Sequence, residues 1–257
     1  MLNDYHSFQP TLTQSGLNKL GIKCKQIFAS KALSNVIYAF IEIQIESPTI
    51  YPVIPDGMIN LFISDSSLFI AGVQTKTNTL PLMQAGKYFG IRFYPGGLNR
   101  LFNVNMQEIC DQQVSNLFIP DSAFIDILSM CFEARNFKQS VGLCESWFIS
   151  RLNNKTNIKF EWVLNEIIKT NGDLKINTIA QTIQLSPRQI NRQFMQNIGV
   201  NTKTFTQIIK LQNSVKTLFK YRNQLESTHG YFDQSHQIHA FKRFLSCPPS
   251  ALLKQFS

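Results

Sequence analysis

Arginine and carboxamide side chains gather on one short stretch near position 190. The stretch 186–196 reads SPRQINRQFMQ, and Ile190 and Phe194, four residues apart, would face inward on a helix. The outward residues would then be Arg188, Gln189, Asn191, Arg192 and Gln196. Arginine can bond bidentately to guanine, and asparagine or glutamine to adenine. These residue types at this spacing therefore favour contact with base edges in nucleic acid.

The residues around this stretch predict the elements that would position it. Ile176, Ile179 and Ala180 give a preceding helix one apolar face, and a short break follows at 184–186. Ser186 before Pro187 is a strong helix start, because serine can cap an orphan N–H and proline fits the first helical position. Two short helices joined by a tight turn predict a helix-turn-helix. An ordinary helical hairpin with a solvated polar face remains the alternative.

A long helix is predicted next along the chain. Apolar residues recur at three- and four-residue steps from Phe205 to Phe219. A helix over 204–220 would be roughly 25 Å long at 1.5 Å per residue. That length could separate two units that read neighbouring major grooves, which lie about 34 Å apart. A plain core helix is the alternative.

The positive charge of the chain is concentrated in its last hundred residues. The whole chain has 25 Lys+Arg and 16 Asp+Glu, a formal net charge of +9. Residues 1–157 hold 12 and 11 of these, so residues 158–257 hold 13 (25 − 12) and 5 (16 − 11), a balance of +8. A basic segment suits a polyanion, because neutralised phosphates release condensed counterions.

The first 115 or so residues have the pattern of β-structure. Short runs at 36–45, 58–63, 68–73 and 88–93 are rich in β-branched and aromatic residues, and Pro52, the 55–57 segment and the 95–97 segment read as turns. This predicts a barrel or sandwich. Helices are expected at 122–137 and 139–152, and the polar stretch 153–157 marks the boundary between domains 1–157 and 158–257.

Two motifs in the C-terminal half resemble the AraC/XylS family of transcription regulators. Leu185-Ser186-Pro187-Arg188, with Ile190, Arg192, Phe194 and Gly199, is similar to the family's first helix-turn-helix. The second is matched by residues 230–236 (GYFDQSH), 241–243 (FKR) and 248–250 (PPS). Together the motifs cover about 160–257, in the family's order and nearly at its spacing.

The resemblance implies a bipartite regulator that grips duplex DNA through two helix-turn-helix units, with activation favoured over repression. The second unit departs from the family: the segment 222–229 is about three residues short, and Gln237 stands where an apolar residue is usual. The second unit could therefore be degenerate. The residues expected to contact DNA are Ser186, Arg188, Gln189, Asn191, Arg192, Gln196, Gln234, Ser235, His236, His239, Lys242 and Arg243.

The N-terminal half resembles a cupin-like sensory domain often fused to such units. The similarity lies in Pro55-Asp56-Gly57 and in 90–97 (GIRFYPGG), although these glycines could be turn residues only. Asp56, Arg92 and Tyr94 are candidate ligand-binding residues, and a structural pair between Arg92 and Asp56 is the favoured alternative. The expected fold is thus α+β: a cupin-like barrel with two helices, then an all-α domain with two helix-turn-helix units joined by a long helix.

Other function classes are disfavoured by what the sequence lacks. Residues 1–157 contain one histidine, His6, which is too few for a metal cupin, and there is no catalytic motif or phosphate loop. We therefore expect no enzyme activity, catalytic residue, metal or cofactor. Five scattered cysteines argue against a disulfide framework.

No run of about 18 apolar residues and no secretory signal is present, which predicts a cytoplasmic protein without a membrane partner. The expected partners are double-stranded DNA and RNA polymerase, with a homodimer and an unidentified small-molecule effector left open. The rival interpretation is a protein-interaction or dimerisation module, with a degenerate DNA-binding unit and the 122–152 helices as a dimer face.

Overall fold

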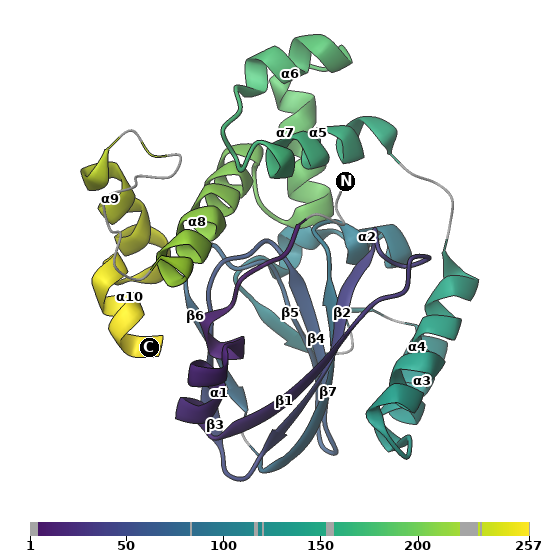
Figure 1. Ribbon diagram of the computed structural model, residues 1–257. Helices are drawn as coiled ribbons and strands as arrows, with labels where there is room; N and C mark the ends of the chain where they lie inside the picture. The colour runs from purple at the N-terminus through teal and green to yellow at the C-terminus, as the bar shows by residue number, and fades with distance from the viewer. Residues whose placement is uncertain are drawn as a thin grey trace.

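The computed structural model has an N-terminal β-domain followed by a helical region (Figure 1). It describes residues 5–82, 84–115, 118–119, 121–152, 157–221, 231 and 233–256. The predicted α+β class, with strands first and helices after, is confirmed. No helix in these ranges is long and apolar enough to cross a membrane.

Six antiparallel strands form the main sheet, in the order β1-β2-β7-β4-β5-β8. A second, two-stranded sheet pairs β3 with β6. The strands are β1 (Ile22–Phe28), β2 (Ile37–Ile45), β3 (Thr49–Val53), β4 (Ile59–Ile63), β5 (Leu68–Ala71), β6 (Asn78–Leu82), β7 (Gly86–Phe93) and β8 (Gln113–Ser115). The four strands predicted from composition correspond to β2, β4, β5 and β7.

The expected barrel is not closed, which corrects that part of the prediction. In the described residues the main sheet ends at β1 on one side and at β8 on the other, and these strands do not pair with each other. Polar residues explain how β1 can remain an edge: Lys23, Lys25 and Gln26 lie exposed along it. Pro52, read as a turn signal, instead lies within β3, in the two-stranded sheet where proline is tolerated.

Alternating side chains give the main sheet two buried faces. Ile41 and Phe62 point into an apolar cluster with Tyr51 and Leu80 of the small sheet. Phe89 and Phe93 face the other way and contact Phe137 and Phe148, with ring centroids 6.3 and 5.9 Å apart. Those two phenylalanines belong to the helical pair that covers this face, and the pair matches the helices predicted at 122–137 and 139–152. The pair consists of α3 (Ser122–Glu133) and α4 (Phe137–Arg151).

The C-terminal region is helical throughout its described elements. The predicted long helix is present as α8, two residues longer at its start. The helices are α5 (Ile158–Lys169), α6 (Ile176–Ile183), α7 (Pro187–Ile198), α8 (Thr202–Lys220), α9 (Gln234–Leu245) and α10 (Pro249–Phe256). Short helices in the β-domain are η2 (Pro10–Leu12), α1 (Gln14–Leu20), α2 (Gly97–Phe102) and η3 (Met106–Ile109).

One cluster of buried apolar residues runs from the β-domain into the helices. Phe160 of α5 lies close to Gly96, and a Cβ added at Gly199, after α7, would lie 2.6 Å from the Met106 carbonyl oxygen. Arg100 of α2 pairs with Glu161 of α5 at 3.4 Å. The two predicted domains therefore share a packed interface, and the boundary at 157/158 stays a prediction.

Candidate nucleic-acid interface

The first helix-turn-helix is built from α6, a three-residue turn and α7. Gln184 ends α6 in the left-handed region, with φ 54°, which bends the chain sharply. Ser186 and Gln189 then form a reciprocal capping box: the Gln189 N–H donates to Ser186 Oγ at 3.2 Å, and the Ser186 N–H donates to Gln189 Oε1 at 2.8 Å. The N-terminus of α7 is therefore fixed by its own residues.

Three apolar residues of α7 anchor this helix to the elements on which it packs. Ile190, Phe194 and Ile198 are buried at a spacing of four, as one face of a helix requires. The Phe194 ring contacts Phe160 of α5 and Phe205 of α8, with centroids 5.3 and 5.6 Å apart. The helix therefore packs on both neighbouring helices, and its C-terminal end packs on η3 of the β-domain.

The outward face of α7 carries the residues predicted to meet DNA. Arg188, Arg192 and Gln196 are exposed at successive turns, and neither arginine has an ion pair within the described ranges. Gln189 and Asn191 are exposed as well, but their side-chain oxygens are engaged locally. Gln189 closes the capping box, and Asn191 Oδ1 accepts from the Thr202 N–H at 3.1 Å. The arginines are thus the side chains best placed to reach a phosphate or a base.

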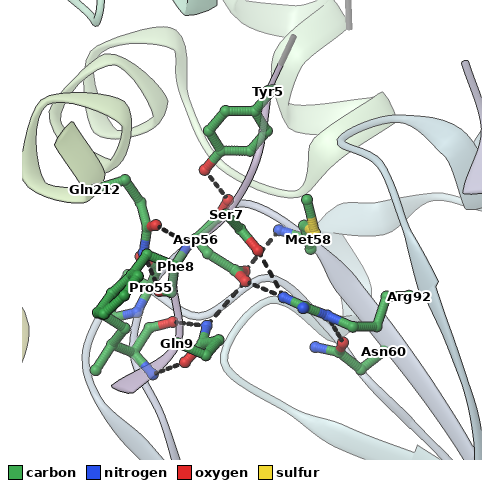
Figure 2. A network of polar contacts seen from close by, with 11 residues as sticks. Tyr5, Ser7, Phe8, Gln9, Pro55, Asp56, Met58, Asn60, Arg92 and Gln212 are labelled. Atoms are coloured by element: carbon green, nitrogen blue, oxygen red, sulfur yellow. Dashed lines mark hydrogen bonds and ion pairs between the residues drawn. The ribbon is translucent and has the colours of Figure 1, made fainter. Parts of the chain in front are cut away.

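A buried glutamine ties α8 to the N-terminal segment. Gln212 is 1% exposed; its Oε1 accepts from the Phe8 N–H at 2.7 Å, and its Nε2 donates to the Phe8 carbonyl at 3.2 Å and the Pro55 carbonyl at 2.8 Å (Figure 2). Nothing in the sequence pattern marked Gln212 as important, because its partners are backbone groups about 157 and 204 positions away.

Asp56 and Arg92 form a buried ion pair beside this contact (Figure 2). The Arg92 guanidinium donates to Asp56 Oδ2 at 2.8 Å, to Ser7 Oγ at 2.7 Å and to Asn60 Oδ1 at 3.3 Å. Gln9 Nε2 donates to the same Asp56 oxygen at 2.8 Å, and the Asp56 Oδ1 accepts from the Met58 N–H. The pair is therefore surrounded by hydrogen bonds that satisfy both charges.

The surroundings of Asp56, Arg92 and Tyr94 determine whether a ligand could reach these candidate ligand-binding residues. The cavity beside Arg92 and Asn60 holds only about 10 Å³, roughly one water-sized sphere. Tyr94 is buried and packs on Tyr38, which lies under the Arg92 guanidinium, so it joins the cluster through that ring. The structure brings Asp56, Arg92 and Tyr94 together, and Arg92 and Asp56 form the ion pair that was the favoured alternative to ligand binding. A ligand-binding role for the three residues stays a prediction.

Burial in this network also affects the Tyr5 hydroxyl. Desolvation and the nearby Asp56 carboxylate raise the pKa of Tyr5 well above its ordinary value. The neutral phenol donates to the Asp56 carbonyl at 2.6 Å. Tyr5 thereby holds the start of the described chain against the 55–57 turn.

The recognition helix of the second predicted unit is α9. Its N-terminus is capped by Asp233, whose Oδ1 accepts from the His236 N–H at 2.8 Å. Phe241 and Phe244 are buried, and so is Gln237, at 8% exposure. The predicted supporting segment 222–229 lies outside the described residues. All the polar residues predicted to contact DNA are exposed: Gln234, Ser235, His236, His239, Lys242 and Arg243.

The described residues contain no group of three His, Cys, Asp or Glu side chains placed to hold a metal ion. His236 and His239, three residues apart on α9, are both exposed. His236 Nδ1 lies 3.9 Å from the Asp233 carboxylate.

Comparisons with known proteins add a family match and several similar structures. Residues 25–115 match the model of a family described as a domain of unknown function (DUF6597). The sequence has no significant match among curated proteins.

Similar solved structures include ToxT from Vibrio cholerae and an AraC-like transcriptional activator, CuxR. ToxT of strain O395, bound to (E)-4-(8-methylnaphthalen-1-yl)but-3-enoic acid, is 12% identical with a TM-score of 0.43, over 92% of this chain and 98% of that chain. Wild-type ToxT of strain SCE256, bound to an unsaturated fatty acid, is 13% identical with a TM-score of 0.41, over 91% and 94%. CuxR is 9% identical with a TM-score of 0.26, over 85% and 95%.

Proposed function

We propose that this protein is a transcription regulator of the AraC/XylS type that binds duplex DNA through its C-terminal helices. The observation that carries the proposal is the first helix-turn-helix: a capped α7, anchored by three buried apolar residues, presents Arg188 and Arg192 outward. The family motifs of the sequence and the +8 balance of residues 158–257 support it.

In this proposal α7 enters the major groove. Arg188 and Arg192 lie one turn apart, so one can read a guanine while the other contacts a phosphate or a second base. Gln196 extends the same face, and the exposed amides of Gln189 and Asn191 lie beside it. Ser186 would contribute by capping the start of α7 and by lying at the edge of the DNA major groove.

The second unit would lie along the same duplex, one helical turn away. α8 spans 19 residues, or roughly 28 Å at 1.5 Å per residue, between the two units. The exposed residues of α9 from Gln234 to Arg243 would contact the neighbouring groove, with Lys242 on phosphate. Contact with RNA polymerase, activation of transcription, and a small-molecule effector are further parts of this proposal.

Selection of bound sequences from a random duplex pool, with the full-length protein, tests the proposal. We expect a recovered motif, and an affinity that falls with salt with a slope of about −0.9 per neutralised phosphate. Arg188→Ala and Arg192→Ala should each weaken binding. Lys138→Ala is the matched control, since Lys138 is an exposed lysine on α4, away from the C-terminal helices.

Binding that recovers no motif and barely depends on salt would contradict the proposal. It would favour the rival function, a protein-interaction module. The exposed apolar side chains of the described α3–α5 helices give that rival its basis: Met130, Ile149, Ile158 and Trp162 are 54, 45, 76 and 38% exposed. Sedimentation of the same protein would then show a self-associated species that Met130→Lys disrupts.

A further inference from the structure

A cavity of about 620 Å³ opens between α8, α9 and the loop that precedes α6. Figure 1 shows α9 beside α8, on the side of the molecule away from α3 and α4. The described residues that line this cavity all belong to the C-terminal hundred residues. The volume is that of an ordinary small-molecule site, which spans roughly 300–1,000 Å³. The cavity shares no described lining residue with the small space beside Arg92, so the two are separate.

The described residues that line this cavity include cations but no aspartate or glutamate. The cations are Lys203 and Lys210 of α8 and Arg243 of α9. Lys210 is already paired with Asp173, at 3.3 Å. Lys203 and Arg243 have no ion pair with any residue that the structure describes. Two positive groups thus face one cavity without a neutralising side chain, which favours an anion that carries two charges.

The histidines of α9 add donors to the same side. His236 and His239 line the cavity together with Thr206 and Gln207 of α8. A phosphate group offers three terminal oxygens, and the planar guanidinium of Arg243 matches two of them. A single carboxylate would pair with only one of the two cations, Lys203 and Arg243. The polar lining residues therefore fit a phosphate better than a carboxylate.

Apolar residues also line the cavity. Leu174 and Ile176 line it from the loop and the first residue of α6, and Ala240 and Phe244 line it from α9. The Arg243 guanidinium lies 5.1 Å from the centroid of the Phe244 ring, so cationic and aromatic surfaces adjoin. A ligand with an apolar or aromatic body would bury the half-buried side chains of Leu174, Ile176 and Ala240, next to the already buried Phe244.

Tyr231 supplies a second, independent sign of an unfilled site. It lines the cavity, and its hydroxyl oxygen is shielded from solvent without a hydrogen-bond partner among the described residues. Burial raises its pKa far above the ordinary value, so the phenol stays protonated and remains a donor. A buried donor without a partner destabilises the protein. Because the hydroxyl oxygen is shielded, an acceptor bound in the cavity would reach it only after the Tyr231 ring moves.

We propose that this cavity binds a small phosphate ester with an aromatic or other apolar body. Lys203 and Arg243 would hold the phosphate, and Leu174, Ile176 and Ala240 would cover the body. His236, His239 and Arg243 are also proposed DNA contacts, so the ligand would compete with DNA at α9. That last consequence rests on the proposed function, whereas the binding site itself does not.

Calorimetric titration of the full-length protein, without DNA, tests the site with four matched probes. Phenyl phosphate carries both features, inorganic phosphate lacks the body, benzoate lacks the second charge, and benzyl alcohol lacks charge altogether. We expect saturable one-site binding of phenyl phosphate, at least tenfold tighter than binding of any other probe. Absence of saturable binding, or equal affinity for inorganic phosphate or benzoate, would overturn the proposal.

Variants locate the binding. Lys203→Glu should weaken phenyl phosphate binding at least tenfold, and Lys138→Glu, the same charge change on α4, should leave it within twofold. Ala240→Phe, which fills the cavity, should abolish binding. If Ala240→Phe fails to fold, Lys203→Glu still tests the site, because Lys203 is exposed and its substitution leaves the core intact. Unchanged affinity in Lys203→Glu would overturn the site, whatever the outcome of the DNA experiments.

Discussion

The two predicted recognition helices, α7 and α9, share their local design and differ in their surroundings. Each is 12 residues long, begins at a side-chain cap and buries at least one aromatic residue. α7 is anchored by a continuous apolar stripe against α5, α8 and the β-domain, whereas α9 buries Gln237. A recognition helix held rigidly loses less entropy on binding than one that must be ordered. We therefore expect α7 to carry most of the sequence discrimination.

The largest expected effect comes from removing the anchor of α7. Phe194 is fully buried between Phe160 and Phe205, so Phe194→Ala should lower the free energy of unfolding by about 3–5 kcal/mol. Phe241→Ala in α9 should cost less, because Phe241, although equally buried, has no ring contact with another aromatic side chain of the described residues, whereas Phe194 has two. Urea unfolding of both variants measures the difference, and equal losses would show that α9 is packed as tightly as α7.

A second, smaller effect tests how much the interface between the β-domain and the helices contributes to stability. Gln212→Ala would leave the half-buried N–H and carbonyl of Phe8 and the buried Pro55 carbonyl without their partner, at an expected cost of about 2–3 kcal/mol in unfolding free energy. Gln181→Ala, at an exposed helical glutamine, is the matched control and should change stability by less than about 0.5 kcal/mol. Equal values for the two variants would mean that the tie between α8 and the N-terminal segment is unimportant.

DNA affinity should separate the helices at the level of single side chains. Arg188→Ala or Arg192→Ala should weaken binding by about 1–3 kcal/mol and relax preference at the base that each contacts. Lys242→Ala should weaken binding uniformly across sequences and lower the salt slope by about 1. Titrations on two duplexes at three salt concentrations provide the comparison. A sequence-dependent loss for Lys242→Ala would assign base reading to α9 after all.

The smallest expected effect is a gain of stability. Gln237 is nearly buried on the inner face of α9, where an apolar side chain would avoid the cost of desolvating an amide. Gln237→Leu should raise the free energy of unfolding by roughly 1 kcal/mol. Thermal unfolding decides the sign, and a loss of stability would reveal that the amide makes a hydrogen bond on which α9 depends.

Local signals explain which features the sequence could predict. The Ser186 cap of α7, the apolar stripe of α8 and the strands rich in isoleucine and phenylalanine are all encoded within a few residues. They were predictable because helix caps and hydrophobic periodicity act at short range.

Long-range partners explain what the sequence missed. β1 carries exposed lysines, and β3 contains Pro52, so neither has the composition of a strand until its partner is known. Gln212 and Gln9 look like ordinary polar residues, and their burial depends on backbone groups from distant segments. Gln189 and Asn191 are a different case: they were predicted as outward polar residues and are exposed, but their side-chain oxygens also accept local hydrogen bonds.

The most direct test of the account is a base-pair scan across a selected binding site. Each base pair under the two helix-turn-helix units is replaced in turn, and the affinity of the full-length protein is measured at fixed salt. We expect penalties of about 1–3 kcal/mol per base pair under α7 and much smaller ones under α9. Equal penalties in the two half-sites, or none in either, would contradict it.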